Sequence, residues 1–147
     1  MGTMALAQLI YVSRRTPALS LDTLNEIVTF STQRNASRSV SGILLCCGKD
    51  LMQLLEGELE DIVTLYDRIR QDSRHTHVSC LYCKNVTRRL CPEWGMGLAD
   101  LQSKAVLDRS RLSKLIDDIR LNVDTSHFAV EARVLLRDFK QQLHKAA

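Results

Sequence analysis

Two neighbouring segments of the chain are apolar on both faces of the strands that they are expected to form. Residues 40–47 read Val-Ser-Gly-Ile-Leu-Leu-Cys-Cys, and after a turn at 48–50 residues 51–55 read Leu-Met-Gln-Leu-Leu. Successive side chains of a strand point to opposite faces, so a strand with apolar residues at consecutive positions has to be covered on both sides. The sequence therefore requires a sheet with a layer of structure on each face.

The order of the other segments predicts how one of these layers is made. Five segments have the length and composition of strands, and two have the periodicity of helices. In chain order they are strand 6–13, helix 21–33, strand 40–47, strand 51–55, helix 59–71, strand 78–86 and strand 93–98. A β-α-β-β-α-β-β order contains two split β-α-β units. We therefore predict an α+β, ferredoxin-like fold with both helices on one face of the sheet.

The C-terminal part of the chain supplies a cover for the second face. Apolar residues recur at helical spacing around 110–121 and again around 127–144. The segment 99–147 is shorter than the usual lower bound of about 50 residues for an independent domain. We predict one domain over 1–98 and a C-terminal helical pair over 99–147 that packs on the other sheet face of this domain or forms a dimer surface.

Composition limits the classes of partner. The chain has 147 residues, of which 45% are hydrophobic and 25% charged, as expected for one compact domain. Its net charge of +3 is spread out, so no nucleic acid or membrane partner is indicated. No apolar run approaches the roughly 20 residues that cross a bilayer. We expect a soluble, cytoplasmic protein.

A cluster of histidines and cysteines near the middle of the chain suggests a metal site. His75, His77, Cys80 and Cys83 lie within nine residues, and the chain has five cysteines in all. If 77–86 is a regular strand, Cys80 and Cys83 point to opposite faces and do not bind one ion. We predict packed, reduced thiols and no metal.

One polar residue interrupts the apolar run 51–55. Gln53 is expected to be buried, and an unsatisfied buried amide costs roughly 1–3 kcal/mol. Its partner could be the backbone, a neighbouring hydroxyl, or a polar heterocycle that needs both a donor and an acceptor. The local sequence leaves these alternatives open.

Six short motifs, taken together, resemble a known family. In order they are Leu9–Ser13, Ser31 with Arg34-Asn35, Val40–Leu45, Gln53–Gly57, Arg68–His75 and Trp94–Met96. In this order and spacing, over about residues 6–98, they resemble the BLUF domain, the blue-light sensor using FAD. The resemblance implies a ferredoxin-like fold with a flavin held between its two helices, in a short stand-alone photoreceptor.

The resemblance also implies a photochemical pair and a route for its signal. Tyr11 matches the tyrosine that gives an electron and a proton after excitation, and Gln53 matches the glutamine whose hydrogen bonds then switch. Trp94 and Met96 match the residues that relay this switch to the C-terminal helices.

The same resemblance implies a cofactor and its contacts. The cofactor is FAD, or FMN in its place, bound without a covalent link. Asn35 matches the contact to the polar edge of the ring, and Ile27 and Ile69 match the clamps on its faces. The contacts to the ribityl and phosphate part are matched by Arg68, Asp72 and His75. The full set of implied binding residues is Tyr11, Ile27, Ser31, Arg34, Asn35, Gln53, Arg68, Ile69, Asp72 and His75.

Each of these assignments has a simpler alternative. Tyr11 could be a core tyrosine that bonds Ser31 or a carbonyl, and Arg68 with Asp72 could be a surface ion pair. No dinucleotide-binding fingerprint or nucleophile–base pair is present, so we do not expect an enzyme. The alternative to a photoreceptor is a light-insensitive ferredoxin-like module that binds proteins. A photoreceptor of this kind is expected to form a homodimer or higher oligomer and to signal to a separate protein.

Overall fold

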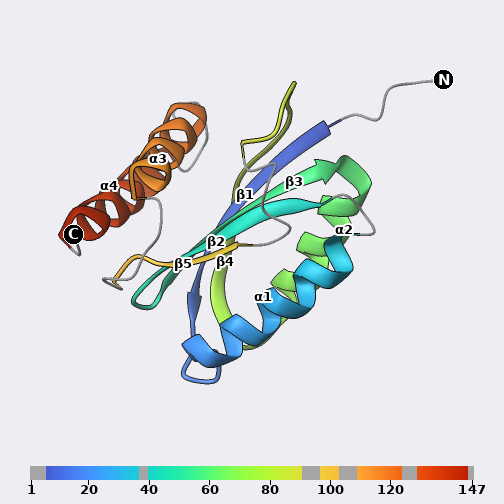
Figure 1. Ribbon diagram of the computed structural model, residues 1–147, viewed down its shortest axis with the longest axis horizontal. Coiled ribbons are helices and arrows are strands. Elements are labelled where there is room, and N and C mark those ends of the chain that lie inside the picture. Colours follow the sequence, from blue (N-terminus) through green and yellow to red (C-terminus); the bar gives the residue numbers. More distant parts are fainter. Residues whose placement is uncertain (1–5, 37–39, 91–96, 103–108, 124–128, 146–147) are drawn as a thin grey trace.

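The computed structural model describes residues 6–36, 40–90, 97–102, 109–123 and 129–145, with side chains for all of these except 29–36, 122–123 and 129–132. Within these ranges the elements are β1 Leu6–Arg15, α1 Leu21–Ala36, β2 Ser41–Cys47, β3 Asp50–Glu58, α2 Leu59–Arg70, β4 His75–Asn85, β5 Gly97–Asp100, α3 Arg109–Val123 and α4 Ala129–Lys145. Figure 1 shows α1 and α2 on one side of the sheet and α3 and α4 on the other. The predicted α+β fold and its two helical layers are confirmed.

The strands form one sheet in the order β4-β1-β3-β2-β5. The β2–β5 pair is parallel, and the other neighbouring pairs are antiparallel. This order places β1 and β3 at the centre, where Tyr11 lies directly opposite Gln53. The two residues of the predicted photochemical pair are thus brought together by strand register.

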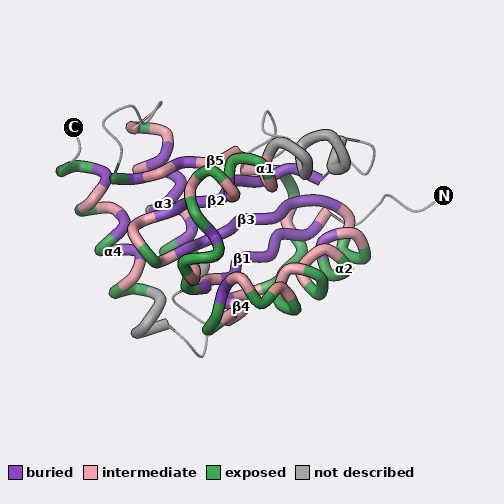
Figure 2. Tube along the Cα trace, turned by 90° about the horizontal axis from the view of Figure 1, so that it is seen from below, coloured by how far each residue is buried: buried purple, intermediate pink, exposed green. Residues whose placement is uncertain are grey.

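Side chains alternate between the two sheet faces, as the apolar pattern requires. On the face covered by α3 and α4, strand residues such as Ile10, Met52 and Leu54 pack with helix residues such as Ile116 and Phe139, all of them buried. On the face covered by α1 and α2, two further clusters are built around Leu9, Tyr11, Leu55 and Ile62, and around Leu24, Leu44 and Leu51. Figure 2 shows β1, β2 and β3 largely buried between the helical layers, whereas most of β4, at the sheet edge, is intermediate or exposed.

Local signals place the turns around this sheet. The Ser20 hydroxyl accepts a hydrogen bond from the Thr23 N–H at 3.2 Å, so Ser20 caps the start of α1. Gly48 adopts φ +61° in the turn between β2 and β3, a backbone conformation that favours glycine. The hairpin that carries Gln53 follows from this turn.

Several predicted element boundaries were wrong: α1 ends at Ala36 instead of 33, β4 begins at His75 instead of 78, and the ends of β3 and β5 also differ. Strand β3 continues through Gly57 to Glu58, which lies opposite Leu6, so Gly57 does not break the strand. Pairing with β1 along its full length keeps this segment extended. The last strand runs over Gly97–Asp100, further along the chain than 93–98; residues 93–96 lie outside the described part.

The geometric argument about the cysteines was also wrong. Leu9 lies opposite Cys83 and Tyr11 opposite Cys80, so a bulge in β4 adds one residue between the two cysteines. Cys80 and Cys83 consequently share one face of the strand. Among the described residues, no three His, Cys, Asp or Glu side chains are grouped to hold a metal ion.

The described helices also include none that is long and apolar enough to cross a membrane.

Candidate functional site

A buried hydrogen bond joins the side chains of neighbouring residues on strands β1 and β3. The Tyr11 hydroxyl donates to Oε1 of Gln53, and only 3% of Tyr11 and 7% of Gln53 is exposed. The burial predicted for Gln53 is therefore observed, and a hydroxyl is one of its partners. A phenol and an amide in direct contact can exchange a proton once the phenol becomes acidic.

The surroundings of Tyr11 hold its proton in the resting state. Burial, and to a smaller extent Tyr66 and Asp72, raise the pKa of Tyr11 far above its ordinary value. The Tyr66 ring lies 5.4 Å from the Tyr11 ring between centroids, and the His75 ring lies edge-on at 6.4 Å. Tyr11 is thus a neutral hydrogen-bond donor that loses its proton only after a large change, such as loss of an electron.

The Tyr11–Gln53 pair forms part of the wall of a cavity between the sheet and helices α1 and α2. The cavity has a volume of about 100 Å³. Its walls are apolar, with Leu24, Ile27 and Val28 from α1 and Leu65 and Ile69 from α2; strand and loop residues complete it: Tyr11, Leu19, Leu44, Leu51, Gln53, Asp72 and His75. Apolar walls with a few converging polar groups are typical of sites that bind flat ring systems.

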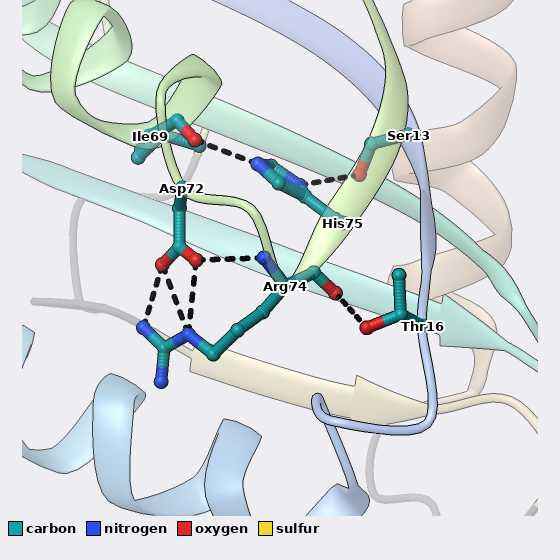
Figure 3. A network of polar contacts seen from close by, with 6 residues as sticks. All are labelled: Ser13, Thr16, Ile69, Asp72, Arg74 and His75. Atoms are coloured by element: carbon teal, nitrogen blue, oxygen red, sulfur yellow. Dashed lines mark hydrogen bonds and ion pairs between the residues drawn. The ribbon is translucent and has the colours of Figure 1, made fainter.

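Asp72, which belongs to the cavity lining, forms an ion pair with Arg74 (Figure 3). Asp72 Oδ2 is 2.6 Å from Arg74 Nη2, and the backbone N–H of Arg74 donates to Oδ1 at 2.9 Å. The side-chain hydrogen bond from Arg74 is the main reason that the pKa of Asp72 falls to about 2. Asp72 is therefore ionised, and its described partner is Arg74 rather than Arg68, which is exposed and does not line the cavity.

His75 joins the end of α2 to β1. Its Nε2 lies 2.6 Å from the carbonyl oxygen of Ile69, and its Nδ1 lies 3.0 Å from the Ser13 hydroxyl (Figure 3). Because a carbonyl only accepts, Nε2 carries the proton and donates it. Both ring nitrogens are engaged within the protein, so His75 positions Ile69 and presents its ring edge to Tyr11.

The structure brings together part of the set of residues that the sequence predicted to bind the flavin. Tyr11, Ile27, Gln53, Ile69 and Asp72 line the same cavity, as does the His75 ring. The side chains of Ser31, Arg34 and Asn35 lie outside the described part of the chain, and so do Trp94 and Met96.

Sequence reasoning missed several contributors to the site. Leu24 and Val28 lie one turn apart on α1, on either side of the predicted Ile27, and Leu65 lies one turn before Ile69 on α2. That helical spacing was a usable signal, because residues four apart share one helix face. Ser13 acts through a contact with His75 that spans 62 positions of the chain, which no local pattern indicates. Arg74 lies two residues after Asp72, and this short spacing was a usable signal for their ion pair.

A larger cavity lies on the opposite face of the sheet, next to α4. Its volume is about 380 Å³, and its lining includes Val12, Arg14, Asp50, His77 and Val134. The charged side chains there are at the surface, and Arg14 pairs with Asp50 at 3.5 Å. We assign the functional site to the smaller cavity because it contains the buried Tyr11–Gln53 pair.

The part of the chain that lines this cavity is similar to known proteins. The family described as BLUF, sensors of blue-light using FAD, matches residues 6–97. The photoactivated adenylate cyclase subunit beta of Euglena gracilis is 39% identical over 94 residues, which is 63% of this chain and 11% of that protein. The chain thus spans about a tenth of the length of this curated relative.

Two solved structures have the same fold. BlrB, a BLUF protein solved in its dark state, is 25% identical with a TM-score of 0.64, and the alignment covers 92% of this chain and 99% of BlrB. BlrP1 of Klebsiella pneumoniae, solved with FMN and cyclic diGMP, is 29% identical with a TM-score of 0.65, over 73% of this chain and 29% of BlrP1.

The side chains around the cavity fit the ring system of a flavin. Residues such as Ile27 and Ile69 can contact the two apolar ring faces, and the amide of Gln53 can both donate to and accept from a polar ring edge. The match over residues 6–97 covers most of the chain and all the residues that line the cavity. The chain therefore belongs to the BLUF family, the sensors of blue-light using FAD.

Proposed function

We propose that this protein is a blue-light photoreceptor that holds FAD, or FMN in its place, between α1 and α2. The carrying observation is the buried hydrogen bond between the Tyr11 hydroxyl and Gln53 Oε1 in the wall of an apolar cavity. Ile27 and Ile69 would clamp the ring, and Asn35, Arg68 and Asp72 would hold the polar parts of the cofactor. Ser31 and Arg34, on the same helix as Ile27, complete the proposed set.

The proposed mechanism uses the proton that Tyr11 keeps in the resting state. A bound flavin, once excited by blue light, supplies an acceptor for one electron. Loss of that electron makes the Tyr11 phenol strongly acidic, and its proton passes along the existing hydrogen bond to Gln53 Oε1. The Gln53 amide would then rotate or tautomerise. The electron would return from the flavin and a proton from the amide, which would restore the Tyr11 phenol beside a changed amide.

We further propose that the changed amide alters the sheet. Gln53 faces α1 and α2, while its neighbours Met52 and Leu54 are buried against α3 and α4. A small shift of β3 is therefore felt by both helical layers. In this proposal Trp94 and Met96 relay the shift to the C-terminal helices.

The receiver of the signal is proposed to be a separate protein or a second copy of this chain. Within this division, residues 1–98 form the sensor and residues 99–147 form the output surface. The cyclase activity in the name of the Euglena relative belongs to that protein. We propose no enzymatic activity for this chain.

The first prediction concerns the cofactor and its response to light. The purified protein is expected to be yellow, to release FAD on acid precipitation, and to show a small red shift under blue light that reverses in darkness. Absorbance spectra before, during and after illumination measure this. A colourless protein that does not take up added FAD would instead support the light-insensitive interaction module.

The second prediction concerns the route of the signal. Replacing Met96 by alanine is expected to leave the red shift intact, because the Tyr11–Gln53 pair is unchanged, but to remove any light-dependent change of assembly. The paired measurement is the absorbance difference spectrum and the molar mass by light scattering, in darkness and in light. The red shift serves as the internal control. Light-dependent assembly equal to that of the native chain would exclude Met96 from the route.

A point variant is a cleaner test here than removal of the C-terminal helices. Leu112, Ile116 and Phe139 are buried in the same cluster as Met52 and Leu54 of β3. Deleting α3 and α4 would expose that apolar sheet face to water and destabilise the sensor as well.

A further inference from the structure

A fully buried carboxylate lies on β3, three residues beyond Gln53, and the proposed photochemistry does not use it. Glu56 is 0% exposed. By strand alternation its side chain lies on the sheet face opposite to that of Gln53, together with those of Met52 and Leu54. A buried carboxylate is costly unless hydrogen bonds or a counter-charge satisfy it, so its partners indicate what it holds in place.

The partners of Glu56 come from a neighbouring strand and from the loop after β4. Glu56 Oε2 accepts a hydrogen bond from Gln8 Nε2 at 3.0 Å and another from the backbone N–H of Leu90 at 2.8 Å. Gln8 in turn accepts a hydrogen bond from the hydroxyl of Tyr82 on β4. The carboxylate therefore ties the loop at Leu90 to β3, and Gln8 and Tyr82 support it from β1 and β4.

Arg89 attaches the same loop to the sheet through a second set of hydrogen bonds. Its Nη1 donates to the Ser41 hydroxyl at 2.7 Å and to the backbone carbonyl of Glu56 at 3.0 Å. Ser41 lies opposite Glu56 in the β2–β3 register. The guanidinium thus places a positive charge beside the strand that carries the buried carboxylate.

The loop that Glu56 holds at Leu90 is part of the connection between β4 and β5. Leu90 directly precedes residues 91–96, and Gly97 directly follows them. Gly97 begins β5 and lies opposite Ile43 of β2. The chain on one side of 91–96 is therefore fixed by the strand that carries Gln53, and on the other side by its neighbour. A displacement of β3 acts directly on Leu90 through Glu56.

We propose that Glu56 is a positioning residue that couples β3 to the loop leading into residues 91–96. Glu56, Arg89 and the Leu90 N–H form a latch, which we name the Glu56 latch. It deepens the proposed function, on which its signalling role rests: the switch at Gln53 moves β3, and the latch passes that movement to the chain that carries Trp94 and Met96.

The latch itself can be tested in darkness, without photochemistry. Replacing Glu56 by glutamine keeps the shape of the side chain but removes the charge that strengthens its hydrogen bonds. Because Arg89 is held by these contacts, we expect trypsin to cleave after it mainly when the loop opens, so that the cleavage rate there follows the open population. The exposed Arg88 is a neighbouring cleavage site, and its fragments are counted separately. For the flavin-loaded protein in darkness we expect cleavage after Arg89 to rise about tenfold in Glu56→Gln. Mass spectrometry of fragments 1–89 and 90–147 gives the rate, relative to cleavage after the exposed Arg70.

Two further variants make this test specific. Glu58→Gln is the matched control, because it makes the same change two residues further along β3, where the side chain forms no capping hydrogen bond; its cleavage after Arg89 should equal that of the native protein. Ser41→Ala removes an acceptor of Arg89 and should raise the cleavage by a smaller factor, about two- to tenfold. Cleavage after Arg89 that is unchanged in both Glu56→Gln and Ser41→Ala overturns the latch.

The signalling role is tested with the single tryptophan of the chain, Trp94. In Glu56→Gln we expect a red shift of normal size, together with a reduced light-induced change of Trp94 fluorescence. A purely structural role would change stability and leave that light response intact, which would overturn the proposal. Loss of flavin from Glu56→Gln would also overturn it, since it would place Glu56 in the flavin site. If the native protein shows no red shift at all, the photoreceptor proposal fails, whereas the dark cleavage result still decides the latch.

Discussion

Replacing Gln53 by leucine is expected to abolish the light-induced red shift completely while FAD stays bound. Leucine is similar in size and keeps the cavity wall apolar, but it offers no acceptor to the Tyr11 hydroxyl and no group that can switch its hydrogen bonds. The unsatisfied phenol is expected to lower stability by about 1–3 kcal/mol. Absorbance difference spectra and FAD quantification on the same sample check both statements.

Two tyrosine variants serve as companion and control for this result. Tyr11→Phe removes the proton donor of the pair and should also abolish the red shift. Tyr82→Phe also removes a phenol hydroxyl, but on the opposite sheet face, where this hydroxyl donates to Gln8. It should leave a normal photocycle. A normal red shift in Gln53→Leu would falsify the proposed hydrogen-bond switch.

Replacing Gly42 by alanine is expected to have the largest effect on folding. A Cβ atom at Gly42 would lie 2.0 Å from the backbone carbonyl oxygen of Leu54, and this atom cannot move without breaking the β2–β3 pairing. The expected loss is about 3 kcal/mol or more in the free energy of unfolding. For a domain of this size that corresponds to a fall in Tm of about 10 °C. Thermal unfolding measured by circular dichroism checks this, and flavin binding should weaken because β3 carries Gln53.

Gly48→Ala is a useful contrast because it acts through a different physical cause. A Cβ atom there has open space, its nearest neighbour being Gln102 Nε2 at 3.6 Å, but the backbone has φ +61°. The expected cost is therefore only about 1 kcal/mol, from backbone strain alone. Equal losses in the two variants would show that close packing against β3 is not what requires glycine at position 42.

Much of the architecture could be predicted because it follows from local periodicity. The apolar residues at consecutive positions in β2 and β3 required cover on both faces, and the structure supplies it with a pair of helices on each side. The position of Gln53 between Met52 and Leu54 likewise determined that it faces away from the C-terminal helices. Alternation along a strand is a property of the backbone, so it can be read without knowing any partner.

The departures from prediction involve the end of a helix, a local change of register, or partners that are distant in the sequence. Spacing alone suggested that Asp72 pairs with Arg68 one helical turn away, but the helix ends at Arg70 and the chain turns, so Arg74 reaches the carboxylate instead. The bulge in β4 placed Cys80 and Cys83 on one face because β1 pairs with an irregular strand. The bulge could not be derived from the β4 segment in isolation, because it depends on the pairing of β4 with β1.

The sequence by itself determined the fold class, the two covered sheet faces and the burial of Gln53, because these depend on the order of apolar and polar residues along single elements. Only the tertiary structure decided which groups meet. The order β4-β1-β3-β2-β5 placed Tyr11 opposite Gln53, and it brought Leu90 within 2.8 Å of Glu56 across 34 positions of chain. Such contacts depend on strand register and on loop closure, and both are set by the packing of the whole chain.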